Sequence, residues 1–424
     1  MPVRDFQAAL QIKDPLHGYI GLSELERQII DLRMTQRLRY IRSPAGIHLV
    51  FPGADSSLMG RMLGVMHVVE IFVSSLGGDY EEIEKARLAA MLFSLSFGPW
   101  ANVMNEYLTV RGYDRRRMAT LIAEKNPIKQ ILKDSKFSKT EVIDLLEKGV
   151  PIKGIRVDLL TTPINPELVD NLERDAYFAG VEYAQLEIRR LFSATRIAKN
   201  KIAFERGALF TLDSYLSAAA NMFDAVYYHK TIRAAELMLL RIMDEAGSRI
   251  IPFPGDDLNG FLLSDDLTAH DILLTVKSDD PESMRAANKI FLDFRKRHLV
   301  KLVSERAIAD AAFLKKIGTP DGLFALETEI AESSGIDVKN LYIDYPDRPS
   351  VSYYPGLHRM DDLVLFERGS KGYEFWPVEE QSGLARSFGR KLRTVRVYTT
   401  RGYRSKVKKP ADLLLESIDS PGSS

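Results

Sequence analysis

Residues 51–67 read FPGADSSLMGRMLGVMH, and this stretch decides the fold. It begins with a proline–glycine turn, and a helical spacing of apolar residues resumes near Met62. A second stretch, residues 92–100, reads LFSLSFGPW and closes another run of helical spacing that starts at Asp79. The two stretches therefore predict consecutive helices of a helical body, separated by turns.

The composition is that of a globular chain, with 45% apolar and 27% charged residues. A length of 424 residues allows a large core and more than one lobe. The formal net charge is zero, so no global field draws the chain to nucleic acid or to a membrane. The chain has no cysteine, which excludes disulfides and thiolate metal sites. Because the apolar runs are too short to span a bilayer, we expect a cytoplasmic protein without membrane contact.

Helical signals dominate the first 300 residues. Ser23 and Glu26 form an S-x-x-E capping box in front of an apolar helical pattern. Further helices are predicted over 183–200, 268–276 and 281–296. From about residue 341 the period changes to that of strands, with a hairpin turn predicted over 369–372. The predicted strands are 341–345, 350–353, 363–366 and 394–398.

Several motifs in this order resemble the HD-domain phosphohydrolases, in particular the deoxynucleoside triphosphate triphosphohydrolase branch. In that branch residues 51–67 would read roughly FPGAxHxRFEHSLGVxH, and residues 91–102 would read LxHDIGHGPFSH. Residues 36–41, QRLRYI, resemble another motif of the family, and so do residues 226–231, VYYHKT. The likeness extends over most of residues 12–300. It implies a fold that is mainly α, with an HD-domain helical core over residues 1–270, a smaller C-terminal α+β lobe over 271–415 and a flexible tail over 416–424.

The family holds a divalent metal with a histidine, an HD pair and a later aspartate. In this chain these positions fall on Arg61, on Phe93 and Ser94, and on Glu167. Arginine has no lone pair to donate, phenylalanine cannot ligate, and a single carboxylate is not a metal site. The resemblance therefore predicts no metal, no cofactor and no catalytic residue. A guanidinium can replace a cation by pairing with a carboxylate, so we expect either an Arg61–Glu167 ion pair or an Arg61 side chain in solvent.

A few groups that would hold a nucleotide in the family remain. They are Asp175, Tyr227 and Lys230, which match the motifs on the later helices. The alternative is that these side chains serve packing and ion pairs only.

The segment 381–410 has ten basic residues and no acidic one. Aromatic residues are interleaved, a pattern that can bind a phosphate backbone and stack bases. The polyanion-binding candidates are Arg390, Lys391, Arg393, Arg401 and Arg404. The alternatives are a solvated strand face or an oligomer contact. The family's C-terminal elements commonly support assembly, so a homo-oligomer is the expected partner arrangement.

Three functions follow from these features. The first is an inactive homologue with a binding, assembly or regulatory role, which pairs with a catalytic homologue or holds a nucleotide. The second is a nucleoside triphosphate phosphohydrolase with an atypical site built from Glu167, Asp170 and the arginines 115–117. The third is a nucleic-acid-binding protein that uses the basic C-terminal segment. We favour the first, in which the chain is not an enzyme.

Overall fold

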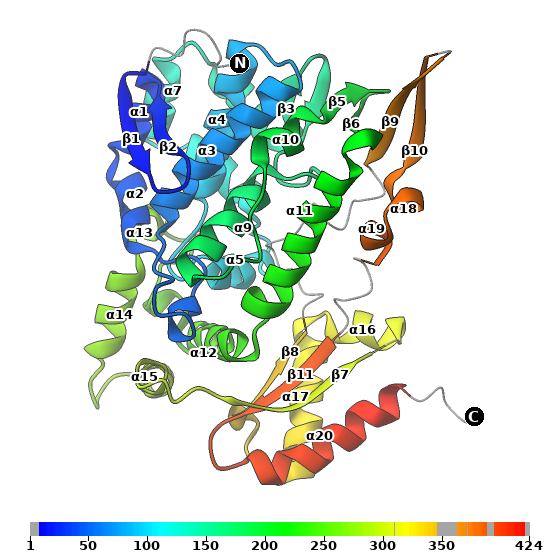
Figure 1. Ribbon diagram of the computed structural model, residues 1–424. Helices are drawn as coiled ribbons and strands as arrows, with labels where there is room; N and C mark the ends of the chain where they lie inside the picture. Colours follow the sequence, from blue (N-terminus) through cyan, green and yellow to red (C-terminus); the bar gives the residue numbers. More distant parts are fainter. Residues whose placement is uncertain (1–7, 309, 346–362, 371, 388–393, 420–424) are drawn as a thin grey trace.

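The computed structural model describes residues 8–308, 310–345, 363–370, 372–387 and 394–419 (Figure 1). With 58% of its residues in helices, the fold is mainly α, as the sequence predicted. The helices up to residue 300 are α1 (Glu24–Ile30), α2 (Arg33–Gln36), α3 (Leu58–Ser75), α4 (Tyr80–Leu95), α5 (Asn102–Thr109), α6 (Arg115–Ala123), α7 (Ile128–Lys133), α8 (Lys139–Lys148), α9 (Pro166–Ala179), α10 (Ile188–Ser193), α11 (Leu209–Met222), α12 (Lys230–Ala246), α13 (Leu258–Leu263), α14 (Asp266–Leu274) and α15 (Glu282–Arg295). The later helices are α16 (Ala311–Ile317), α17 (Pro320–Ser334), α18 (Val378–Gln381), α19 (Gly383–Ser387) and α20 (Arg404–Asp419).

Local sequence signals explain where these helices begin. The predicted capping box is confirmed, because Ser23 Oγ accepts from the Glu26 N–H at 3.2 Å and Glu26 Oε2 accepts from the Ser23 N–H at 2.9 Å. Asp79 caps α4 in the same way. The helices predicted over 268–276 and 281–296 are observed as α14 and α15.

Helix α3 lies at the centre of the helical body, where α4 and α9 pack against it (Figure 1). It is long and apolar enough to cross a membrane by length and composition, although the apolar runs were expected to be too short. Inside the protein, however, 67% of that apolar window is buried, as in the core helix of a soluble protein.

The strands form small sheets. Two are hairpins, β1 (Leu10–Asp14) with β2 (Gly18–Leu22) and β3 (Val150–Ile152) with β4 (Ile155–Val157). A four-stranded sheet has the order β10 (Gly372–Pro377), β9 (Val364–Gly369), β6 (Lys201–Glu205), β5 (Thr195–Ala198). A three-stranded antiparallel sheet has the order β7 (Lys301–Ala307), β11 (Thr394–Thr399), β8 (Leu341–Asp344), and α16, α17 and α20 lie beside it (Figure 1).

The predicted strands near 341, 363 and 394 are confirmed as β8, β9 and β11, and the hairpin turn after β9 is confirmed by its pairing with β10. The strand predicted over 350–353 lies outside the described residues. The long helix predicted over 183–200 is wrong, because the chain forms the short helix α10 and then β5. Lys199 and Asn200 have φ of 50° and 59°, and this left-handed pair makes a two-residue hairpin turn that no helix can contain.

Two hydrophobic clusters organise the chain. The larger contains α1 to α12 and also buried residues of α14, α15 and β9, which lie beyond the predicted boundary at residue 270. The smaller is built from β7, β8, β11, α16, α17 and α20. The domain division itself stays a prediction. Helix α20 runs to Asp419, so residues 416–419 are helical and do not belong to a loose tail, whereas residues 420–424 lie outside the described part.

Candidate functional site

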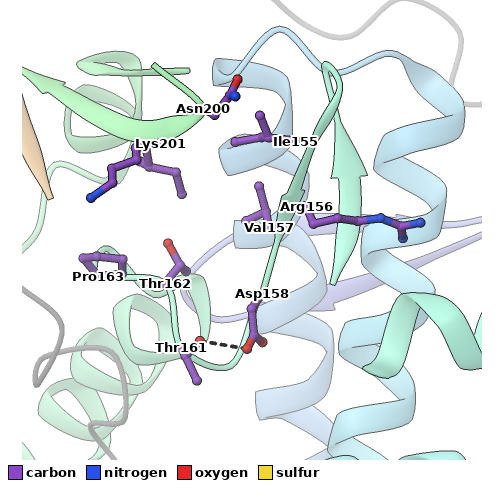
Figure 2. A pocket seen from close by; sticks show the side chains of 10 residues that line it. Ile155, Arg156, Val157, Asp158, Thr161, Thr162, Pro163, Asn200 and Lys201 are labelled. Carbon is purple, nitrogen blue, oxygen red and sulfur yellow. Dashed lines mark hydrogen bonds between the residues drawn. The ribbon is translucent and has the colours of Figure 1, made fainter. Parts of the chain in front are cut away.

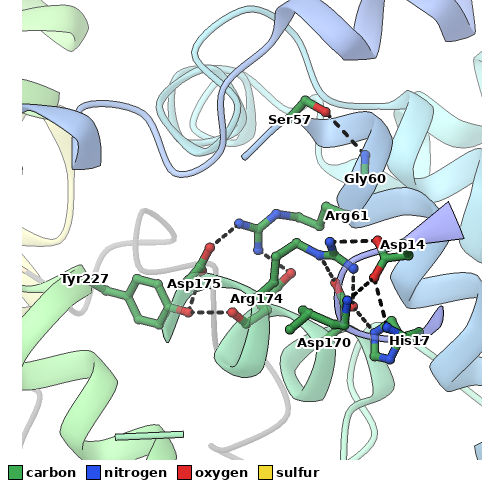
Figure 3. Close-up of polar contacts among 11 residues, drawn as sticks. Asp14, His17, Ser57, Gly60, Arg61, Asp170, Arg174, Asp175 and Tyr227 are labelled. Atoms are coloured by element: carbon green, nitrogen blue, oxygen red, sulfur yellow. Dashed lines mark hydrogen bonds and ion pairs between the residues drawn. The ribbon is translucent and has the colours of Figure 1, made fainter. Parts of the chain in front are cut away.

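The candidate site lies where α3 approaches α9. A glycine of α3 makes this approach close, because a Cβ on Gly64 would collide with Asp170 Oδ1 and with Arg174 Nη2. Helix α9 begins at Asn165, whose side chain caps it, and Pro166 occupies the first turn, where a missing N–H costs nothing. The two helices thereby bring the Arg61 position of α3 against the second half of α9 (Figure 3).

Arg61 is buried in this site, with only 4% of its side chain exposed. Its Nη2 donates to Asp175 Oδ1 at 2.6 Å and to the Ser43 carbonyl at 2.9 Å, and its Nη1 donates to Asn171 Oδ1. The Tyr227 hydroxyl donates to the other oxygen of Asp175 at 2.7 Å (Figure 3). Burial raises the pKa of Asp175, and the adjacent guanidinium and hydroxyl oppose that rise. The result is a closed network in which every oxygen of the carboxylate is used.

Tyr227 reaches Asp175 from a π-helical turn. Residues Phe223–Tyr227 form this turn between α11 and α12, and the Tyr228 N–H donates to the Phe223 carbonyl at 2.7 Å. The structure thus brings together two of the three predicted nucleotide-binding residues, Asp175 and Tyr227, both buried. The third, Lys230, is exposed at the first turn of α12 and is not part of this network.

The expected Arg61–Glu167 ion pair is wrong. Arg115 binds Glu167, with Nη1 at 2.8 Å from both carboxylate oxygens. Its guanidinium also donates to the Phe93 carbonyl at 3.2 Å and lies 4.3 Å from the centre of the Phe97 ring. The reason is the position along α9: Glu167 lies in the first turn, whereas Asp175 lies eight residues later, about 12 Å further along the axis. Arg61 faces the later turns of α9, where Asp175 lies, and not the first turn with Glu167.

The residues at the positions that match the family's metal ligands do not fit a divalent cation. Phe93 is buried and apolar, and the Ser94 hydroxyl donates to the Ala90 carbonyl at 2.9 Å. The space beside Glu167 is a cavity of about 10 Å³, lined mainly by Val65, Val69 and Phe93, with Ala90, Leu159 and Leu160. Among the described residues, no three His, Cys, Asp or Glu side chains are grouped to hold a metal ion.

A second buried network adjoins the first. Asp170 Oδ1 lies 2.7 Å from His17 Nε2 and accepts from Arg174 Nη2 at 2.9 Å, and Arg174 Nη1 donates to Asp14 Oδ2 at 3.0 Å (Figure 3). Burial raises the pKa of Asp170, but Arg174 and His17 lower it by more, so that this pKa is about 2. Burial, followed by the charge of His17, lowers the pKa of His67 to about 4. No spacing signal in the sequence links His17 to Asp170, which lies 153 positions away.

The basic candidates are only partly described. Arg390, Lys391 and Arg393 lie outside the described residues. Arg401 and Arg404 are exposed between β11 and the start of α20. They lie near Lys301, whose pKa is lowered by burial and by the charges of Arg401, Arg297 and Arg404. The structure thus adds Lys301 and Arg297, which sequence reasoning missed because they lie about 100 positions earlier in the chain.

Comparisons with known proteins agree with this architecture. The chain is 28% identical over 241 residues to the uncharacterized protein YwfO of Bacillus subtilis, which is 55% of each chain. It is 22% identical over 355 residues to the deoxynucleoside triphosphate triphosphohydrolase SAMHD1 homolog of Dictyostelium discoideum, covering 79% of this chain and 68% of that protein. The chain spans about half the length of several curated relatives that it matches.

The fold also occurs in a crystal structure of a hypothetical protein from Aquifex aeolicus, with a TM-score of 0.71 at 22% identity over 95% of this chain and 99% of that chain. The family model of the HD-associated region matches residues 186–421, which is more than half of the sequence. The chain therefore belongs to the family of HD-domain proteins that carry this HD-associated region.

Proposed function

We propose that this protein is an HD-domain phosphohydrolase homologue that has lost its metal ligands and acts by binding, assembly or regulation. The observation that carries the proposal is the Arg61 guanidinium, a permanent cation buried between α3 and α9 and bonded to Asp175, Asn171 and the Ser43 carbonyl. A divalent ion placed beside this fixed positive charge would be repelled. Arginine has no lone pair to donate, so the residue at the position of the family's histidine cannot coordinate a metal ion.

The surrounding groups support the same conclusion. An atypical hydrolase would need a free base and a free cation near the phosphate. Glu167 is paired with Arg115, and Asp170 is paired with Arg174 and His17. Both carboxylates are already paired with a cation, so a reaction that used either as a base would first have to break an existing ion pair.

The same reasoning bears on nucleotide binding. Asp175 accepts hydrogen bonds from both Tyr227 and Arg61, so a nucleotide that used Asp175 or Tyr227 would have to open this network. We therefore propose assembly, with a second copy of the chain or with a catalytic homologue, as the retained role. Sedimentation of the purified protein alone and with such a homologue measures both arrangements, and a protein that stays monomeric in both experiments excludes this role.

The central test combines metal analysis with a hydrolysis assay of deoxynucleoside triphosphates in the presence of manganese. The triphosphohydrolase homologue of Dictyostelium is the positive control. We expect less than stoichiometric metal and no turnover for this chain. Tight stoichiometric metal together with turnover would overturn the proposal. A thermal shift series with nucleotides is the companion test, because a ligand at 100 times its dissociation constant adds about 2.7 kcal/mol of stability.

A second candidate function is polyanion binding at the basic cluster of Arg297, Lys301, Arg401 and Arg404. The specific observation is that Arg401 and Arg404, which follow β11, lie close to Arg297 and Lys301, which lie before and at the start of β7, and that the three arginines lower the pKa of Lys301. Each phosphate contact contributes a slope of about −0.7 in the salt dependence of single-strand binding. Changing Arg401 and Arg404 to glutamine should reduce that slope and the retention on single-stranded DNA. Lys339→Gln, an exposed change outside the cluster, is the control and should leave retention unchanged.

A further inference from the structure

A cleft of about 210 Å³ lies on another part of the helical body, away from the Arg61 network (Figure 2). Its walls come from β4, from the loop 158–163 and from the start of β6. The apolar part of the lining consists of Ile155, Val157, Pro163 and Ile202. The volume is below the range of about 300–1,000 Å³ that is common for drug-sized ligands, so the cleft suits a small molecule.

The walls of the cleft are held in place before any ligand arrives. The β3–β4 hairpin turns at Lys153 and Gly154, with φ of 47° and 85°, and the β5–β6 hairpin turns at Lys199 and Asn200, with φ of 50° and 59°. Two-residue turns of this left-handed kind match the twist of the flanking strands and are therefore rigid connections. Binding of a ligand between the two hairpins therefore costs the protein little conformational entropy.

The loop between the hairpins is fixed by one carboxylate. Asp158 accepts from the Leu160 N–H at 3.0 Å, from the Thr161 hydroxyl at 2.7 Å and from Arg116 Nη2 at 2.7 Å. The other charged wall residue, Arg156, binds Asp144 and the Gly149 carbonyl. Asp158 and Arg156 are therefore already engaged in ion pairs and hydrogen bonds within the protein, and neither side chain is available to select a ligand.

The hydroxyl of Thr162 and the ammonium of Lys201, both in the lining, have no such partner among the described residues. Thr162 is 5% exposed, and its hydroxyl has no hydrogen-bond partner among the described residues. This hydroxyl points toward the space between Lys201 and Val157 (Figure 2). Lys201 is exposed at the start of β6 and forms no ion pair within the described parts of the chain. A buried hydroxyl without a partner is unfavourable, and a ligand oxygen placed here would satisfy it.

We infer that this cleft binds a small monocarboxylate with an apolar body. The carboxylate would accept from the Lys201 ammonium and from the Thr162 hydroxyl, while the body packs against Ile155 and Ile202. One free ammonium matches one negative charge. A phosphate dianion carries one negative charge more than Lys201 can offset, and the same wall contains the Asp158 carboxylate. The inference does not depend on the loss of metal binding, since the cleft and the Arg61 network share no residue.

The test is titration calorimetry of the full chain with benzoate, with its neutral analogue benzamide and with inorganic phosphate. We expect saturable binding of benzoate only. Lys201→Gln should weaken it about tenfold, because a charge-assisted hydrogen bond is lost. Lys199→Gln is the matched control, since that neighbouring ammonium lies 4.1 Å from the Phe375 ring and outside the lining, and it should leave binding unchanged.

Thr162→Val separates a ligand contact from a structural role. The valine is nearly the same shape and removes an unpartnered buried hydroxyl, so the ligand-free variant should melt no lower than the parent while it binds benzoate more weakly. Three results would overturn the inference: equal binding of benzamide and benzoate, equal losses in the two lysine variants, or unchanged benzoate binding in both Lys201→Gln and Thr162→Val.

Discussion

Two buried arginines of this protein show how differently a guanidinium can be used. Arg61 has one carboxylate, Asp175, and completes its contacts with neutral oxygens of Asn171 and Ser43. Arg233 of α12 binds Asp344 of β8, with Nη2 at 2.7 Å, and Glu236 at 2.6 Å, and Glu106 lies 3.8 Å away. The first site balances one charge against one charge. The second holds more negative charge than positive charge, and it fastens the C-terminal sheet to the helical body.

The largest effect is expected at the crowded site. Arg233→Met would leave three buried carboxylates without their cation, and removing one partner of a buried pair costs about 3–5 kcal/mol. Urea denaturation of the variant measures this loss. Arg241→Met is the matched control on the same helix, because its pair with Glu327 is only partly buried and should matter less. Equal losses in the two variants would show that burial does not set the difference.

A smaller loss is expected at the balanced site. Among the described residues, Arg61→Met removes the cation from one carboxylate, Asp175, so we expect about 3 kcal/mol, at the lower end of the same range. Adding Asp175→Asn to this variant removes the stranded charge and should restore much of the stability. A double-mutant cycle in urea measures the coupling. If the two changes are simply additive, the ion pair contributes no coupling and the comparison of the two arginines fails.

The approach of α3 to α9 can be tested with two glycines of one helix. Gly64→Ala should cost about 1–3 kcal/mol, because the new methyl group collides with Asp170 and Arg174. Gly60→Ala is the control: its nearest neighbour would be Arg174 Nη1 at 3.6 Å, an ordinary contact, and alanine favours the helix by up to about 1 kcal/mol. Thermal unfolding of both variants should therefore move in opposite directions.

The smallest effect is a pH dependence confined to the crowded site. Burial raises the pKa of Glu236 to about 7, with Arg233 and Asn102 opposing the rise. A raised carboxyl pKa means that the folded state holds a proton that the unfolded state releases. The resulting stability is present below the unfolded value of 4.5 and is lost as the pH rises through about 7. The free energy of unfolding of the parent minus that of Glu236→Gln should therefore fall as the pH rises from about 4.5 to about 7, and a value that rises with pH contradicts this assignment.

The sequence predicted much of the fold because its signals are local. The capping box at Ser23 and the strands near 341 and 394 depend on residues a few positions apart. The helix predicted over 183–200 failed because a helical spacing was counted across a left-handed hairpin turn at Lys199 and Asn200. That turn gives no signal in a count of apolar residues.

The candidate site was predictable only as a set of positions. The family resemblance assigned Arg61 to a metal-ligand position and Asp175 and Tyr227 to nucleotide-binding positions, and in the structure Asp175 contacts both other side chains. The resemblance could not say which turn of α9 faces Arg61, and the partner predicted, Glu167, belongs to Arg115. Contacts such as His17 with Asp170 depend on the packing of distant segments, which periodicity does not encode.

The direction in which the Tyr227 side chain points depends on the number of residues in the π-helical turn Phe223–Tyr227. A regular α-helix advances by about 100° per residue, so deleting one residue from this turn would let α11 close its usual ladder and would swing the Tyr227 ring away from α9. Asp175 would then lose its hydroxyl donor although no side chain in contact with it had been exchanged. In this family, a one-residue gap in an alignment at this turn is thus as informative about the contact of Tyr227 with Asp175 as a substitution in the Arg61 network.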